Sequence, residues 1–324
     1  MKVLQVDLIK YTRSMSINLE INQRCSELTR SLEIDPCGTA INASLFLAVD
    51  VPLPWPKPVF NHQLLIGVEE LLSNHSFPVR LVASVPENNN DLTLTAYMFD
   101  EGSLNRQQWA FNAPDLSALL ERVLEGQTID GFKEVPQEKQ KRELWICTQG
   151  SHDVCCGSEG TSLAIEVNKH LPKVEIRRVS HLGGHRFAPT AITFPDGRMW
   201  SHLDIEDLLE ICNRKNIGKG LLKKCRGWCG SEIGKEQVAE REGLNLYGWD
   251  WDEYKRRTSV VSEEKSQTKI FVTGIHDEDQ SEITFEVLLI ESEETPILSC
   301  DRAGEPPSKW QKQYEVQEVN KKFD

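Results

Sequence analysis

Two cysteines and two histidines in the middle of the chain could together bind a metal. Eight residues separate Cys147 from Cys156, and His181 and His185 flank a Leu-Gly-Gly segment further along the chain. Two thiolates and two imidazoles suit either a closed zinc site or a [2Fe–2S] cluster in which histidine replaces cysteine on one iron. Structural zinc sites usually take their cysteines from a much tighter knuckle. The wide spacing therefore favours the cluster, with zinc as the alternative.

Four further side chains lie next to this set in the sequence. Cys155 precedes Cys156 and could replace it as a ligand. Asp153 and Arg186 could hydrogen-bond a ligand or adjust the charge around the metal, because groups behind the ligands set ring orientation and potential. His152 has no counterpart in the ligand pattern, and we expect it at the surface.

The local pattern places the four ligands in two loops at one end of a sheet. A short apolar strand at 143–147 precedes the cysteine loop, a helix follows at 161–170, and a second strand at 174–180 precedes the histidines. The consecutive glycines between the two histidines discourage a helix. We therefore expect the two imidazole rings to converge from a loop.

The next elements complete a thioredoxin-like layout. Strands at 190–194 and 198–203 are joined by Pro195-Asp196-Gly197, a strong hairpin signal. An amphipathic helix at 204–214 begins with acidic residues, which the helix dipole favours. The resulting order, β-α-β-β-α, is typical of thioredoxin-like domains.

The amino-terminal part of the chain has an α/β pattern of its own. Its predicted elements are strands at 44–51, 78–85 and 92–99, helices at 62–75 and 115–124, and an extended proline-rich connection at 51–59. A polar run from Glu125 to Arg142 has little to bury and predicts a linker. We expect an α/β protein with an N-terminal α/β domain at 1–138 and a thioredoxin-like ferredoxin domain at 139–260. Residues 261–324 would add a C-terminal β-hairpin extension and a polar tail.

The sequence around the candidate ligands is similar to that of a known family. Residues 145–167 and 179–203 contain the motifs CT-x-G-x-x-D-x-CC and H-x-GGHRFAP, and together they closely resemble the sucrase/ferredoxin-like family. Residues 24–40 and 44–55 resemble the amino-terminal region of the same family. The resemblance covers roughly residues 20 to 235.

The resemblance implies one [2Fe–2S] cluster held by Cys147, Cys156, His181 and His185, with Cys155 as the alternative to Cys156. It also implies that the second domain is a thioredoxin-like ferredoxin. The sucrase part of the family name finds no support, because glycoside hydrolysis needs two facing carboxylates and no pair among the 50 acidic residues stands out. We expect no sucrose hydrolysis.

Composition argues against several other classes of protein. The 37 Lys and Arg residues oppose 50 Asp and Glu residues, and the net charge of −13 argues against a nucleic-acid-binding protein and suits a basic partner. No apolar run reaches the length of a membrane span, and the start, MKVLQVDLIKYTRSM, lacks the apolar region of a signal peptide. We therefore expect a cytoplasmic protein. In that setting nine cysteines favour metal or redox chemistry over disulfides, with Cys25 and Cys37 as buried structural thiols.

We expect a one-electron carrier, a ferredoxin-like redox protein rather than a catalyst, that docks with a redox partner protein. Neutral imidazoles leave less negative charge at a cluster than thiolates do, so its potential should exceed that of an all-cysteine ferredoxin. An imidazole ligand also has a second nitrogen that could release a proton, which would couple electron uptake to proton uptake.

Two other functions remain open. A thioredoxin-like thiol redox protein would use Cys155 with Cys156 or Cys225 with Cys229, although the chain contains no C-x-x-C motif. An interaction module would instead hold structural zinc at the same four ligands. Without such a role, Cys225 and Cys229 would be reduced thiols in a loop.

Overall fold

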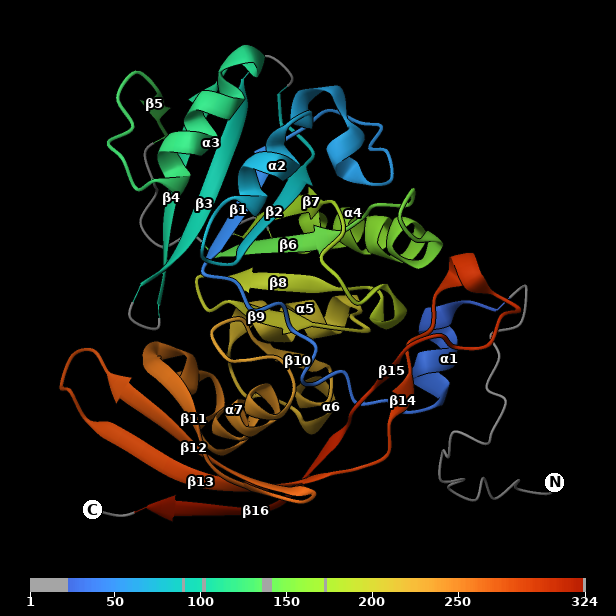
Figure 1. Cartoon of the computed structure of the whole chain (residues 1–324), viewed down its shortest axis with the longest axis vertical. Coiled ribbons are helices and arrows are strands. Elements are labelled where there is room, and N and C mark those ends of the chain that lie inside the picture. Colours follow the sequence, from blue (N-terminus) through green and yellow to red (C-terminus); the bar gives the residue numbers. More distant parts are fainter. Residues whose placement is uncertain (1–22, 89–90, 101–102, 136–141, 172–173, 323–324) are drawn as a thin grey trace.

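A ten-stranded mixed sheet forms the centre of the computed structural model, which describes residues 23–88, 91–100, 103–135, 142–171 and 174–322 (Figure 1). Its strands are β1 (Leu45–Asp50), β2 (Val79–Ser84), β3 (Leu92–Asp100), β4 (Ser103–Phe111), β5 (Lys133–Glu134), β6 (Glu143–Cys147), β7 (Glu175–Val179), β8 (Ala191–Phe194), β9 (Arg198–Trp200) and β10 (Cys225–Trp228). Across the sheet they lie in the order β10-β9-β8-β6-β7-β2-β1-β3-β4-β5. The mixed α/β class expected from the sequence is confirmed.

The two halves of this sheet share one strand order. In the first half β1 pairs parallel with β2 and antiparallel with β3, and β3 pairs with β4. In the second half β6 pairs parallel with β7 and antiparallel with β8, and β8 pairs with β9. A single antiparallel bridge, Ser84 to Val179, joins the halves. The expected boundary near residue 138 lies outside the described residues, and the division into domains stays a prediction.

The apolar run in β1 is explained by burial on both faces of the sheet. All six residues of β1 are buried. Leu47 and Val49 face a core that includes α3, whereas Phe46 and Ala48 face a second core that includes Cys147 and Cys156. A strand covered on both faces needs no polar alternation.

Helices cover the sheet where the sequence has apolar stripes. They are α1 (Cys25–Ser31), α2 (Val68–Ser73), α3 (Leu116–Leu124), α4 (Thr161–His170), α5 (Ile205–Asn213), α6 (Lys219–Leu222) and α7 (Lys235–Tyr247). The buried residues of α3 recur at helical spacing, as its sequence predicts. Asp204 and Asp207 close a capping box at the start of α5, which fixes where that helix begins.

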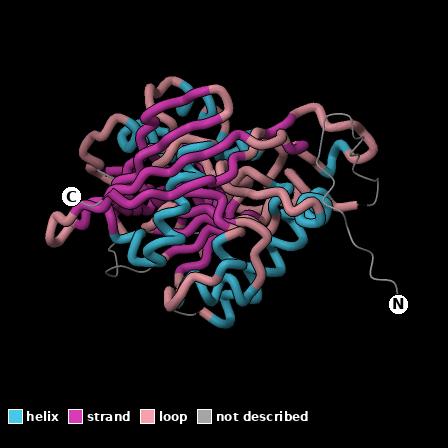
Figure 2. Tube along the Cα trace, turned by 90° about the horizontal axis from the view of Figure 1, so that it is seen from below, coloured by secondary structure: helices cyan, strands magenta, loops and turns pink. Residues whose placement is uncertain are grey.

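A second, four-stranded sheet lies below the first in Figure 1, and Figure 2 views it from below. Its strands are β11 (Tyr254–Glu264), β12 (Gln267–His276), β13 (Glu282–Glu291) and β16 (Tyr314–Lys322), in that order. The predicted hairpin corresponds to β12 and β13. The prediction of a polar tail after it is wrong, because β16 pairs with β13 and lays Val316 and Val319 against the core.

A C-terminal arm, residues 292–313, connects β13 to β16 and carries the short pair β14 (Thr295–Pro296) and β15 (Trp310–Gln311). The arm lies beside α1 (Figure 1). The buried guanidinium of Arg186 donates hydrogen bonds to Pro296 O, at 2.8 Å, and to Gln311 Oε1. These contacts bring the last part of the chain to the candidate site.

The sequence pattern does not predict α7, which packs between β10 and the second sheet. Its buried face includes polar side chains, and Glu240 lies 2.9 Å from Arg198 and 3.2 Å from Arg256. Because charged residues occupy buried positions of this helix, its sequence lacks the apolar stripe by which an amphipathic helix is recognised. The helix predicted at 62–75 is also shorter than expected, since Gly67 adopts a positive φ of 82° directly before α2.

Among the described residues, no helix combines the length and the apolar composition needed to cross a bilayer. The first fifteen residues, on which the expectation of no signal peptide was based, lie outside the described part of the chain.

Candidate metal centre

The predicted ligands lie at one edge of the main sheet because β6 and β7 are parallel neighbours. Cys147 ends β6 and is in register with Val179 at the end of β7. Cys156 opens a π-helical turn that leads into α4, and His181 follows β7 after one residue. Carboxyl ends of adjacent parallel strands share one edge, so the two loops meet there.

Three of the four predicted ligands form one group. The ligand atoms of Cys147, Cys156 and His181 all lie within 4.8 Å of one another. Both thiols are fully buried. Hydrogen bonds from Cys156 and His181 lower the pKa of Cys147 despite its burial, while the bond to Cys147 raises the pKa of Cys156. We call these three residues the cysteine–histidine group.

His185 lies beside this group rather than in it. Its ring centroid is 5.8 Å from that of His181. Its Nδ1 atom lies 3.1 Å from Asp153 Oδ2 and 3.6 Å from Cys25 Sγ. Burial opposes ionisation of Asp153, but hydrogen bonds from His185 and the Cys155 amide lower its pKa to about 2. The predicted contact between Asp153 and a candidate ligand is therefore present.

The adjacent cysteines take part in different groups. Cys155 joins Cys25, Cys300 and Asp153, whose ligand atoms also lie within 4.8 Å of one another. We call this set the three-cysteine group. Within it the hydrogen bond from Cys25 lowers the pKa of Cys155 to about 6 and raises that of Cys25. Nothing in the sequence pattern indicates that Cys300 lies here, because 145 positions separate it from Cys155.

Side chains that the sequence analysis did not select hold the ligand loops in place. Gln149 accepts a hydrogen bond from the His181 amide at 3.0 Å and donates one to Pro56 O at 2.7 Å. The fully buried Arg226 donates to Gly183 O at 3.1 Å. Burial lowers the pKa of Arg226 to about 10, while the nearby thiols of Cys156 and Cys147 favour its charged form. A buried cation thus faces the cysteine–histidine group.

Two further residues near the candidate ligands have partners that the sequence pattern does not indicate. His152 is half-buried, and its ring stacks on that of His181 with centroids 3.6 Å apart. Burial lowers the pKa of His152 to about 4. Among the described residues, the guanidinium of Arg186 donates its hydrogen bonds to the C-terminal arm, at Pro296 O and Gln311 Oε1, and not to a candidate ligand. Both outcomes depend on packing between distant segments.

Two glycines permit the backbone geometry of the site. A Cβ atom on Gly160 would lie 2.0 Å from Cys147 O, so only glycine lets the helical turn approach the end of β6. Gly184 adopts a φ of 68°, and a Cβ there would lie 2.7 Å from Arg226 Nη2. Positive φ and close approach are the two conditions that favour glycine.

The cysteines away from these groups are buried or half-buried free thiols. Cys225 lies in β10 rather than in the expected loop, and Cys229 directly follows that strand. Burial raises the pKa of Cys225, and raises that of Cys229 to about 12. The predicted burial of Cys37 is confirmed, and Cys25 is buried as well but belongs to the three-cysteine group.

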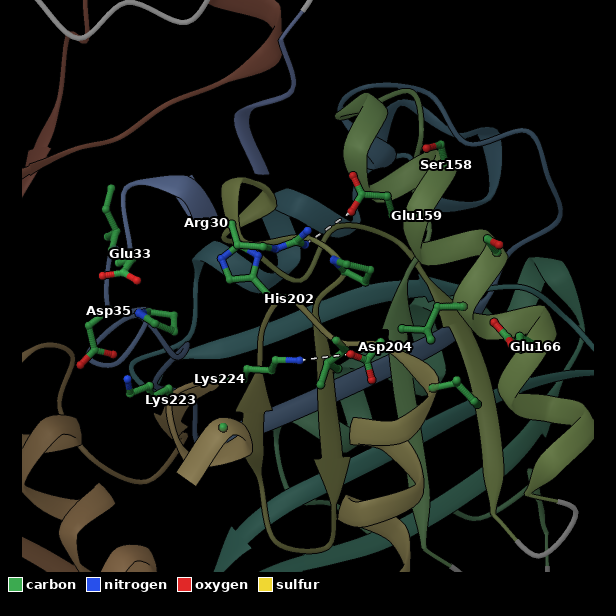
Figure 3. A pocket seen from close by; sticks show the side chains of 18 residues that line it. Arg30, Glu33, Asp35, Ser158, Glu159, Glu166, His202, Asp204, Lys223 and Lys224 are labelled. Atoms are coloured by element: carbon green, nitrogen blue, oxygen red, sulfur yellow. Dashed lines mark hydrogen bonds and ion pairs between the residues drawn. The ribbon is translucent and has the colours of Figure 1, made fainter. Parts of the chain in front are cut away.

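A cavity of about 1090 Å³ lies beside the candidate centre, between α1, α4, α5 and α6 (Figure 3). Charged side chains of both signs line it and are partly paired with one another. Arg30 lies 4.0 Å from Glu159, and Lys224 lies 3.4 Å from Asp204. None of the four predicted ligands is among the described residues that line this cavity.

A comparison with protein families places the segment that contains the candidate ligands inside a known family model. The family model described as Sucrase/ferredoxin-like matches residues 36–227, more than half of the chain. The matched segment contains the whole cysteine–histidine group and His185, but neither Cys25 nor Cys300. No curated protein and no solved structure matches the chain.

Proposed function

Because the chain belongs to the sucrase/ferredoxin-like family, we propose that it is a one-electron carrier with a [2Fe–2S] cluster bound by Cys147, Cys156, His181 and His185. The convergence of Cys147, Cys156 and His181 within 4.8 Å at a buried sheet edge carries this proposal. The group lies inside the matched segment. Sulfur and nitrogen donors of this kind suit iron–sulfur ligation.

The residues present fit such a group. Nδ1 of His181 is buried and has no hydrogen-bond partner among the described residues. A buried polar atom without a hydrogen-bond partner costs free energy unless a ligand or a metal binds it. A metal bound by the His181 ring would also hold that ring in place. The geometry also favours Cys156 over Cys155 as the second thiolate, because Cys155 belongs to the three-cysteine group.

When bound, the cluster would supply a site that accepts and returns one electron. The chain's own residues would set the conditions for that exchange. Asp153 accepts the hydrogen bond from Nδ1 of His185 and so leaves Nε2 free as a ligand. Hydrogen bonds from Gln149 and Arg226 fix the backbone of the histidine loop at His181 and Gly183.

Positively charged side chains near the cysteine–histidine group favour the addition of negative charge there. Arg226 is a buried cation within electrostatic reach of both thiols, and Arg80 donates a hydrogen bond to His181 O. Together with two neutral imidazoles, these cations support a potential above that of an all-cysteine ferredoxin. Coupling of electron uptake to a proton at a histidine stays a prediction.

The strand order supports a thioredoxin-like second domain. The order β7-β6-β8-β9, with β6 and β7 parallel and the others antiparallel, agrees with the layout expected from the sequence. The first half repeats this order but has no cysteine in the loop after β1. We propose that the first half shapes the surface on which a redox partner protein docks.

The test is chemical analysis of protein purified without oxygen. We expect about two iron and two acid-labile sulfide ions per chain, and an electron paramagnetic resonance signal after one-electron reduction. Cys147→Ser and Cys156→Ser should abolish the signal, because an alcohol poorly replaces a soft thiolate. Cys212→Ser, which changes a half-buried thiol on α5, is the matched control and should leave the signal unchanged. Protein that contains zinc but no sulfide would refute the proposal.

A further inference from the structure

Three cysteines from remote parts of the chain meet next to the candidate cluster site. Cys25 begins α1, Cys155 lies in the helical turn between β6 and α4, and Cys300 lies in the C-terminal arm. Cys155 Sγ is 3.7 Å from Cys25 Sγ and 3.4 Å from Cys300 Sγ. Three separate segments therefore place sulfur atoms around one point.

The spacing of these sulfur atoms suits a tetrahedral metal. Zinc binds thiolates at about 2.3 Å, which places two sulfur atoms of a tetrahedron about 3.8 Å apart. The observed separations of 3.7 and 3.4 Å are close to that value. A disulfide needs its sulfur atoms at about 2.05 Å, and all three residues are free cysteines.

Asp153 supplies a fourth donor. Its carboxylate is buried, and Oδ2 lies 3.9 Å from Cys25 Sγ. The Cys155 amide donates to Oδ1 at 2.8 Å, which fixes the carboxylate in the loop. The four ligand atoms lie within 4.8 Å of one another. Zinc accepts both sulfur and carboxylate oxygen ligands.

We propose that Cys25, Cys155, Cys300 and Asp153 bind one Zn²⁺ ion. On binding, the thiols that are still protonated release their protons to solvent, so that three thiolates hold the ion, and no electron is transferred. Three thiolates and a carboxylate exceed the charge of the ion, and the buried Arg186 lies within electrostatic reach of Cys25. The ion would fasten α1 and the C-terminal arm to the loop that carries Cys156.

The zinc site stands apart from the proposed cluster because consecutive residues of a helical turn point in different directions. Cys155 faces α1 and the arm, whereas Cys156 faces the end of β6. Asp153 links the two places, since Oδ2 also lies 3.1 Å from His185 Nδ1. The zinc proposal does not depend on the identity of the cluster, so the two can fail separately.

Zinc, iron and sulfide contents of the full chain, purified without oxygen, test this proposal. We expect about one zinc per chain in addition to iron. Cys300→Ser should remove most of the zinc and keep the iron and sulfide. Cys147→Ser should do the reverse, and Cys212→Ser should change neither metal. Zinc that survives Cys300→Ser, or that is lost with Cys147→Ser, would overturn the assignment.

Cobalt provides a second measurement that does not rely on a folded variant. Wild-type protein stripped of zinc with a chelator is titrated with Co²⁺, which reports thiolate ligands through charge-transfer absorption. We expect saturation at about one Co²⁺ per chain, and competition by Zn²⁺. A titration without thiolate charge-transfer bands would contradict the proposal.

Discussion

Asp153→Asn tests whether a carboxylate orients His185 as a ligand. The two oxygens of Asp153 accept two different donors, the Cys155 amide at 2.8 Å and His185 Nδ1 at 3.1 Å. Asparagine has nearly the same shape but only one acceptor oxygen. Either the Cys155 amide or His185 Nδ1 would then face the NH₂ group of asparagine, which cannot accept a hydrogen bond. The substitution therefore removes one charge-assisted hydrogen bond without creating a cavity.

The expected cost follows from that single lost bond. A hydrogen bond to a charged group contributes about 1.5–3 kcal/mol, which corresponds to a factor of about 10 to 150 in an equilibrium constant. Losing the partner behind a metal-bound histidine typically weakens metal affinity about 10- to 100-fold. We expect Asp153→Asn to weaken the affinity for the cluster about 10- to 100-fold relative to wild type. His185→Ala, which removes the ligand itself, should lose the cluster outright.

The assay follows loss of cluster absorbance while an iron chelator competes, in wild type and variant. Asp204→Asn is the matched control, because Asn caps a helix as well as Asp and this residue caps α5. The same change is repeated in a Cys300→Ser background, where any effect transmitted through zinc is absent. Cluster retention equal to wild type in both backgrounds would refute the role of Asp153. A loss as complete as that of His185→Ala would refute the calculated size.

Two further predictions concern the stability of the fold around the site. Gly183→Ala and Gly184→Ala should each cost about 1–2 kcal/mol in unfolding free energy, because both residues have positive φ. Gly184→Ala should cost more, because its Cβ would lie 2.7 Å from Arg226, whereas the atom nearest to a Cβ on Gly183 would be 3.5 Å away. Denaturant titrations measure both losses, and equal losses would contradict this prediction. Burial opposes ionisation of Asp252, but Arg198 and neighbouring guanidinium groups hold its pKa far below the usual range. Its contribution is present above the unfolded pKa of about 3.9 and is lost as pH falls through the folded value, so stability should drop in acid and Asp252→Asn should reduce that drop.

Local patterns in the sequence were enough to predict much of the second half of the main sheet. Strands β6 to β9, helices α4 and α5 and the turn at Pro195-Asp196-Gly197 lie where apolar periodicity, capping and turn residues predict them. These signals act over a few residues and survive in any tertiary context. The parallel pairing of β6 with β7 then brings the loop containing Cys147 to the loop containing His181.

Other elements were not predicted because polar residues that form ion pairs inside the protein break their apolar pattern. In β4, Arg106 and Gln108 face inward, and Arg106 lies 3.1 Å from the buried Glu143. In α7, Glu240 is fully buried among arginines. A pattern based on hydropathy counts such residues as surface residues, because their ion partners come from other elements. β4 and α7 were therefore not predicted.

The sequence by itself determined a candidate ligand set, Cys147, Cys156, His181 and His185, through residue type and spacing. Only the tertiary structure decided that Cys155 and Cys156 face different partners, that His152 stacks on His181, and that Cys300 reaches Cys155. The last contact joins residues 145 positions apart. It depends on how the second sheet and its C-terminal arm pack against the main sheet. Spacing along the chain fixes only neighbours within a loop, whereas contacts between remote segments follow from the burial of whole elements.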